Sequence, residues 1–179
     1  FFFEFKMQIE VPIHKQMFVN ARALIYRIEN DTLELLVQTR HRMGQKPVIE
    51  FPGGTVETFE PLLEALKREV REETGLELTD IEGQSTRIEI QSNNLTAECV
   101  SPYVVYQTIQ GFNGMGAFFR CQAEGTLFSE GDGSQNVHWE EVDELIHKLD
   151  EDTNQFSVMS AAILTKIKKE GTKRFVLRT

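Results

Sequence analysis

The stretch that decides the fold is Gly54-Thr-Val-Glu-Thr-Phe-Glu60, followed after seven residues by Arg68-Glu-Val-Arg-Glu-Glu-Thr-Gly-Leu76. Pro61 suits the first turn of a helix, where the missing N–H would have no partner anyway. Gly75 suits the far end, where the chain turns into a left-handed conformation. Between them an apolar residue recurs every four positions, at Leu62, Leu66 and Val70. This spacing predicts an amphipathic helix between Pro61 and Gly75.

Three carboxylates share one face of this predicted helix. Glu69, Glu72 and Glu73 stand at i, i+3 and i+4, which places them about 5–6 Å apart. Like charges at that spacing repel each other, and folding does not require them. A hard divalent cation would relieve the repulsion, because Mg2+ prefers carboxylate oxygens and keeps water molecules for chemistry. The alternative interpretation is a solvated helix face supported by an ordinary ion pair between Glu64 and Arg68.

The whole pattern resembles the signature of the Nudix hydrolases. That signature has a glycine, five residues, a glutamate, seven residues, Arg-Glu, an apolar residue, any residue, Glu-Glu, any residue, a glycine and an apolar residue. Every position matches, from Gly54 and Glu60 to Leu76. The resemblance implies an α/β/α sandwich with a mixed sheet. It also implies hydrolysis of a nucleoside diphosphate that is linked to another group.

The resemblance further implies a metal site in and around this box. Mg2+, with Mn2+ as a substitute, would be held by Glu69, Glu72 and Glu73 and by the backbone carbonyl of Gly53. Divalent ions neutralise the charge that builds on non-bridging oxygens when water attacks a pyrophosphate, and they lower the pKa of a bound water. Arg68 is expected to orient the box by pairing with Glu60. The resemblance implies that the general base is either Glu69 or a glutamate in a later loop.

Two residues outside the box resemble the MutT-type members, which clear oxidised nucleoside triphosphates. Glu130-Gly131 precedes Trp139 and is predicted to add a metal-binding glutamate, with Asp132 as the rival and a solvated connector as the alternative. Asn154 follows Trp139 by fifteen residues and is predicted to read a guanine edge through its amide. Its alternative role is a cap for the last helix.

Two further residues are predicted to bind the substrate. Arg40 opens the basic loop 40–46 just before the box. An arginine there suits a phosphate clamp, because its guanidinium grips phosphate oxygens in pairs. Phe51 lies in the lead-in Glu50-Phe-Pro-Gly-Gly54, which is similar to the MutT-type lead-in.

The rest of the chain predicts strands before and after the central helix and two helices at the end. A mixed sheet with both faces covered fits this order. The expected strands are 18–28, 33–39, 81–91, 100–109, 115–123 and 137–139, and the expected helices are 142–149 and 156–169.

Length and composition set the outer limits. At 179 residues the chain is expected to be a single domain over 1–179, with residues 1–6 a flexible tail or not native. The net charge of −9 argues against a surface that coats nucleic acid. No apolar run reaches the roughly 20 residues of a membrane span. Two cysteines, Cys99 and Cys121, fit reduced thiols in the cytoplasm.

The leading hypothesis is therefore a cytoplasmic, Mg2+-dependent enzyme that acts on a small-molecule nucleotide. Neither nucleic acid nor a membrane is expected as a partner, and a homodimer is compatible with the sequence. A nucleoside triphosphate would give the monophosphate and pyrophosphate. The alternative substrate is ADP-ribose or another nucleotide sugar, although the proline that ADP-ribose hydrolases carry about fifteen residues past the box is missing. A non-catalytic ligand sensor is the third hypothesis, and the intact box argues against it.

Overall fold

The centre of the fold is built from long strands with unbroken apolar runs, in a computed structural model that describes residues 16–128, 130–131, 133–172 and 175. β1 (Phe18–Glu29) pairs in parallel with β9 (Gly114–Gly125) and antiparallel with β2 (Thr32–Arg40). Asn30 and Asp31 join β1 to β2 with positive φ at both positions, as a tight hairpin turn requires. The predicted strands at 18–28, 33–39 and 115–123 are confirmed.

The remaining strands extend this sheet on both sides. Its order is β10-β11-β2-β1-β9-β5, with β3 beside β2, β4 beside β1 and β8 beside β9. These further strands are β3 (Val48–Glu50), β4 (Gly53–Thr55), β5 (Leu76–Ile81), β8 (Val104–Gln107), β10 (Glu130–Gly131) and β11 (Ser134–Glu141). Parallel and antiparallel pairs both occur, so the sheet is mixed.

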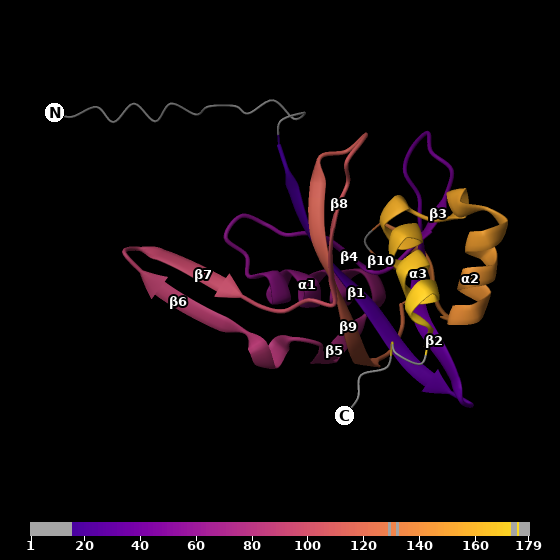
Figure 1. The fold of residues 1–179 in the computed structure, drawn as a ribbon, viewed down its shortest axis with the longest axis horizontal. Coiled ribbons are helices and arrows are strands. Elements are labelled where there is room, and N and C mark those ends of the chain that lie inside the picture. The colour runs from indigo at the N-terminus through magenta and orange to yellow at the C-terminus, as the bar shows by residue number, and fades with distance from the viewer. Residues whose placement is uncertain (1–15, 129, 132, 173–174, 176–179) are drawn as a thin grey trace.

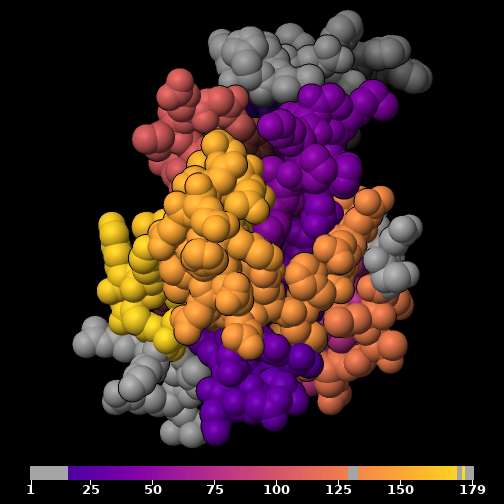
Figure 2. Space-filling model, turned by 90° about the vertical axis from the view of Figure 1, so that its right-hand side faces the viewer, coloured from indigo at the N-terminus to yellow at the C-terminus, as the bar shows by residue number. Residues whose placement is uncertain are grey.

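Helices cover both faces of the sheet, because successive side chains of a strand point to opposite sides. On one face, Ala23 and Ile25 of β1 belong to a core with α1 (Leu62–Thr74). On the other face, Leu24 and Tyr26 belong to a core with α2 (Val142–Glu151) and α3 (Val158–Glu170). Figure 2 shows the orange and yellow residues of this second helical layer beside the indigo N-terminal strands. The predicted α/β/α sandwich with a mixed sheet is confirmed.

The central helix also agrees with the prediction. α1 starts directly after Pro61 and ends at Gly75, whose φ of 78° is left-handed and whose N–H donates to the Arg71 carbonyl at 3.0 Å. Leu66 and Val70 are fully buried as expected, whereas Leu63 rather than Leu62 completes the buried stripe. The helix therefore lies where its local signals place it.

The segment after the helix differs from the prediction. A single strand at 81–91 is wrong, because the chain forms β5, a short 3₁₀ turn (Gln84–Thr86) and then β6 (Ile88–Ser92). The strand expected at 100–109 is only β8, and β7 (Leu95–Cys99) precedes it. Asn93 and Asn94, both with positive φ, make the turn of a β6–β7 hairpin. This hairpin projects from the body of the molecule (Figure 1).

The end of the described chain carries a smaller correction. The last helix starts at Val158 rather than at 156, because Ser157 caps it by accepting from the Ser160 N–H. Asn154 is therefore not the cap of this helix; it lies in a 3₁₀ turn (Thr153–Gln155) that Asp152 caps. The strand expected at 137–139 is part of β11, and the helix expected at 142–149 is α2.

Among the described residues, no helix combines the length and the apolar character that crossing a bilayer requires. Cys99 is exposed and Cys121 is buried, and they do not form a disulfide with each other.

Candidate functional site

The box folds as a short strand, a loop and a helix, and it brings a carboxylate against the backbone of a glycine. β4 carries Gly53 and Gly54, and α1 carries the glutamates. A Cβ atom on Gly54 would lie only 2.3 Å from Oε2 of Glu69. Only glycine therefore lets the Glu69 carboxylate lie this close to the strand.

Glu73 is the buried acid of the box. Glu73 is only 5% exposed. One of its carboxylate oxygens, Oε2, accepts a hydrogen bond from Nε2 of Gln38 at 2.9 Å and another from the Gly53 N–H at 2.8 Å. Burial outweighs these two hydrogen bonds and raises the pKa of Glu73 to about 7. Without a cation, this carboxylate is therefore protonated more readily than that of an exposed glutamate, because burial favours the neutral form.

Arg68 gathers the other acids of the helix. Its Nε and Nη2 donate to the two carboxylate oxygens of Glu60 at 2.8 and 2.9 Å. Its Nη1 donates to Glu69 at 2.8 Å and to Glu72 at 3.2 Å. This bonding lowers the pKa of Glu60 and raises that of Arg68. The predicted ion pair between Arg68 and Glu60 is present, and the same guanidinium fixes the direction of Glu69.

A cavity of about 750 Å³ lies over this part of the box. Glu69 and Glu73 line it, whereas Glu72, whose side chain is 46% exposed and pairs with Arg68, is not among its lining residues. The cavity is also lined by cations of the basic loop, namely Arg40, Arg42 and Lys46. Acids and bases therefore face one common space, a combination that suits a metal-bound phosphate ester.

Beside the box, the cavity contains a buried ionic cluster that sequence reasoning missed. Glu50 is 2% exposed and lies between two arginines, 3.8 Å from Nη1 of Arg22 and 3.1 Å from Nη1 of Arg40. Arg22 also donates to the carbonyl of Phe51 at 3.0 Å. The available signal was Arg22 itself, a charged residue between two alanines at the start of an apolar run.

Two of the predicted substrate contacts do not line the cavity. The side chain of Phe51 is 1% exposed and packs edge-on against Phe118 in the core. Its place next to the box brings its backbone, rather than its ring, near the site. Asn154 is exposed and donates from both its backbone and its amide to Asp152. Of the three predicted substrate-binding residues, the structure brings only Arg40 to the carboxylates.

The backbone of Glu130 lies in β10, which pairs with β11 and packs beside α1. Its side chain lies outside the described part of the structure, as does Asp132. The adjoining strand is tied to the box, since the hydroxyl of Ser134 donates to the Glu73 carbonyl at 2.9 Å. This bond places the start of β11 at the end of the helix that carries the acids.

The donors present fit a hard divalent cation. They are the carboxylate oxygens of Glu69 and Glu73, and Mg2+ and Mn2+ prefer such oxygens. A nearby cation would also favour the charged form of Glu73, which burial alone disfavours. Across the residues that the structure describes, however, no three His, Cys, Asp or Glu residues form a group that could hold a metal ion. Arg68 engages two acids of the box, because its Nη1 donates to both Glu69 and Glu72.

The chain matches the model of the NUDIX domain over residues 19–161. A search of curated proteins gives no match.

Solved structures share the fold at low sequence identity. One from a study of MutT from Aliivibrio salmonicida and Vibrio cholerae has a TM-score of 0.56 at 16% identity, covering 87% of this chain and 100% of that one. The NUDIX domain of Shewanella oneidensis NrtR, complexed with ADP ribose, has a TM-score of 0.60 at 12% identity, covering 87% and 89%. A C. elegans Ap4A hydrolase has a TM-score of 0.51 at 15% identity, covering 85% and 96%.

Proposed function

The chain belongs to the NUDIX-domain family of hydrolases, and we propose that it hydrolyses the pyrophosphate bond of a nucleotide with Mg2+ as cofactor. The leading substrate is a nucleoside triphosphate, cleaved to the monophosphate and pyrophosphate. The observation that carries this proposal is the shared cavity, in which Glu69 and Glu73 face Arg40, Arg42 and Lys46. A polyphosphate chain needs both groups, because the acids hold its metal and the bases hold its oxygens.

Glu69, Glu72, Glu73 and the Gly53 carbonyl would hold the cation, with Glu130 as a further ligand. When bound, the cation neutralises charge on the non-bridging oxygens and lowers the pKa of an attacking water. Glu72 has to turn from Arg68 toward the cavity to join this set. Mn2+, which takes the same oxygen donors, is expected to substitute.

The residues of the chain divide the remaining tasks. Glu69 is positioned by Arg68 and faces the cavity, so it is our first choice as the general base, with Glu130 as the alternative. Arg40 keeps one guanidinium nitrogen on Glu50 while its 32% exposed side chain remains accessible to a phosphate. This anchoring limits the entropy that Arg40 loses when it binds.

A turnover screen with a matched pair of variants tests the proposal. The purified protein is assayed with Mg2+ against dGTP, 8-oxo-dGTP, dCTP and ADP-ribose, and the products are separated by ion-exchange chromatography. We expect nucleoside monophosphate and pyrophosphate, and no turnover with EDTA. Glu69→Gln should lower kcat by about 10²-fold or more. Glu64→Gln is the control, since Glu64 lies on the same helix but pairs with Lys67 on the surface.

Two other results of this screen would indicate a different function. ADP-ribose as the best substrate would replace the triphosphate reading with the nucleotide-sugar alternative. Ligand binding without any turnover would indicate a sensor and contradict the hydrolase proposal.

Two wider expectations belong to the same proposal. We propose that the chain acts as one domain, because the family match spans both helical layers. We also propose a cytoplasmic location, which the unpaired state of Cys99 and Cys121 supports.

A further inference from the structure

A stacked pair of aromatic rings lines the same cavity as the carboxylates. Phe18 starts β1 and Phe112 lies in the β8–β9 turn; their ring centroids are 5.3 Å apart with an interplanar angle of 22°. Phe112 remains 47% exposed, although a ring of this size is normally buried when it serves only the core. We propose, resting on the function proposed above, that Phe112 is a stacking platform for the nucleobase of the substrate.

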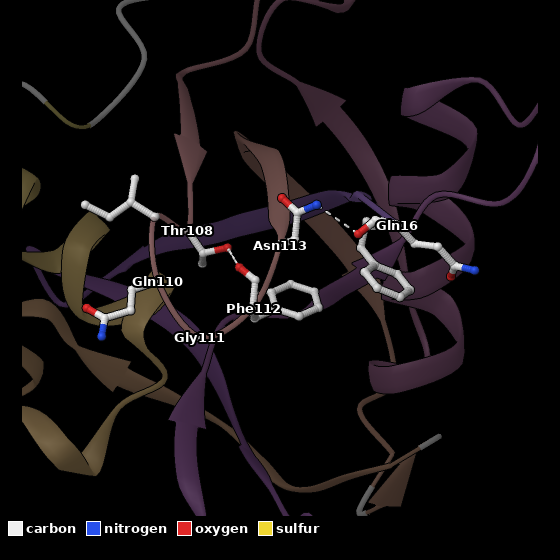
Figure 3. Close-up of a pocket in the computed structure, with 8 residues that line it drawn as sticks. Gln16, Thr108, Gln110, Gly111, Phe112 and Asn113 are labelled. Atoms are coloured by element: carbon white, nitrogen blue, oxygen red, sulfur yellow. Dashed lines mark hydrogen bonds between the residues drawn. The ribbon is translucent and has the colours of Figure 1, made fainter. Parts of the chain in front are cut away.

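The turn that carries Phe112 is held in place by several hydrogen bonds. The hydroxyl of Thr108 accepts from the Gly114 N–H at 3.0 Å and donates to the Phe112 carbonyl. The amide of Asn113 donates to the Gln16 carbonyl at 3.0 Å (Figure 3). These contacts fix the turn before any ligand arrives, so a ring placed on it loses little conformational freedom on binding.

Gly114 allows the Phe112 ring to take this position. A Cβ atom on Gly114 would lie 2.4 Å from Cε1 of the Phe112 ring, a distance that real atoms do not adopt. The ring thus lies over a bare stretch of backbone at the start of β9. It lies against Phe18 and Gly114, and it lines both the cavity with the carboxylates and a neighbouring hollow of about 380 Å³.

The cavity has the composition that a nucleotide requires. Its apolar lining includes Phe112, Phe156 just before α3, and Val158 and Met159 at the start of α3. Val158 is 68% exposed, so this lining is accessible. A nucleotide has a flat aromatic base at one end and charged phosphates at the other, and stacking on an aromatic ring suits any base. The acids and cations described above would take the phosphates.

Ile109 offers a matched control in the same turn. It is 93% exposed and lines a neighbouring hollow of about 380 Å³ rather than the cavity with the carboxylates. Its removal takes a large apolar side chain from the turn without touching the proposed platform.

Binding measurements with and without a base test the platform directly. The affinities of AMP and of ribose 5-phosphate, which lacks the base, are measured by calorimetry for the wild type, Phe112→Ala, Phe112→Tyr and Ile109→Ala. We expect Phe112→Ala to weaken AMP binding by about 5- to 150-fold and to leave ribose 5-phosphate binding unchanged. Phe112→Tyr should bind AMP as the wild type does, because it keeps the stacking surface, and Ile109→Ala should do the same.

The outcomes separate the platform from the proposed reaction. Equal losses for both ligands, or no loss for AMP, would overturn the platform, even if nucleotide turnover is found. Absence of measurable AMP binding by the wild type would overturn it as well. If the wild type shows no turnover of any nucleotide but the selective loss appears, the platform stands and the proposed hydrolysis fails. The melting temperature of Phe112→Ala checks that removing this half-exposed side chain leaves the fold intact.

Discussion

At Glu73, the burial that folding imposes disfavours the charged carboxylate that binding a cation requires. Its carboxylate is buried behind β4, where it accepts hydrogen bonds from Gln38 and Gly53, and its pKa rises to about 7. In the unfolded chain the same group has an ordinary pKa near 4.5. Between these two values the folded protein holds a proton that the unfolded protein releases. Stability without metal is therefore expected to fall as the pH rises through this window.

Replacing this acid by its neutral analogue should remove that cost. In EDTA, Glu73→Gln is expected to be more stable than the wild type by up to about 3 kcal/mol at pH 8, with a smaller difference at pH 5. The same variant should lose turnover by about 10²-fold or more and gain no stability from added Mg2+. Urea denaturation at both pH values, with and without Mg2+, measures the free energy of unfolding of the variant and of the wild type. A stability difference that does not change with pH would contradict the raised pKa; Glu72→Gln, at an exposed side chain, is the control.

Sequence reasoning reached the residues of the box but not their surroundings. The grouping of the three glutamates follows from their spacing along one helix, since a helix fixes which positions are neighbours. The pairing of Arg68 with Glu60, which precedes the helix, was implied by the family resemblance instead. The stacking of Phe18 on Phe112 brings together residues that lie far apart in the chain, and only the parallel pairing of β1 with β9 creates it. Phe51 was placed in the pocket because of its position beside the box. Its ring, between β3 and β4, instead packs against Phe118 in the core.

At the scale of elements, α1 was predictable because its signals are local. Pro61, Gly75 and the apolar spacing mark its ends and its buried face without reference to other segments. The segment 76–107 was not predictable in the same way. Its alternation suggested strands, but the turn at Asn93-Asn94 and the edge position of β5 decide how many strands form.

Arg68 connects the loop of the box to its helix, and its removal should affect both. Arg68→Ala is expected to cost about 1–3 kcal/mol of stability, because Glu60 and Glu69 are only 16% exposed and lose their partner. Turnover should fall as well, since Glu69 loses its fixed direction. Arg68→Lys, which cannot bond both oxygens of Glu60 and also reach Glu69, should recover part of the stability. Denaturation curves together with separate kcat and KM values measure this. Unchanged stability with a raised KM alone would show that Arg68 contacts the phosphates instead.

At the scale of the whole molecule, one sheet serves two cores. Alternate residues of β1 and β9 belong to opposite layers: Phe119 packs with α1, and Phe118 packs with α2 and α3. If β1 and β9 separated from the helices on one face, the apolar core on the other face would also lose its support. The projecting β6–β7 hairpin is different, because its apolar residues Ile88, Ile90 and Leu95 are all more than half exposed.

Three identical substitutions test whether the two layers unfold as one domain. Leu66→Ala in the α1 layer and Leu164→Ala in the α3 layer remove fully buried side chains, so each is expected to cost about 2–5 kcal/mol. Leu95→Ala, at a 75% exposed position of the hairpin, should stay within about 0.5 kcal/mol. Urea unfolding is followed by far-UV circular dichroism and by the fluorescence of Trp139, which packs against the α1 core. Both signals should shift together in both core variants, because the shared strands couple the layers. If Leu164→Ala shifted the dichroism but left the Trp139 transition in place, the layers would unfold separately and the single-domain proposal would be wrong.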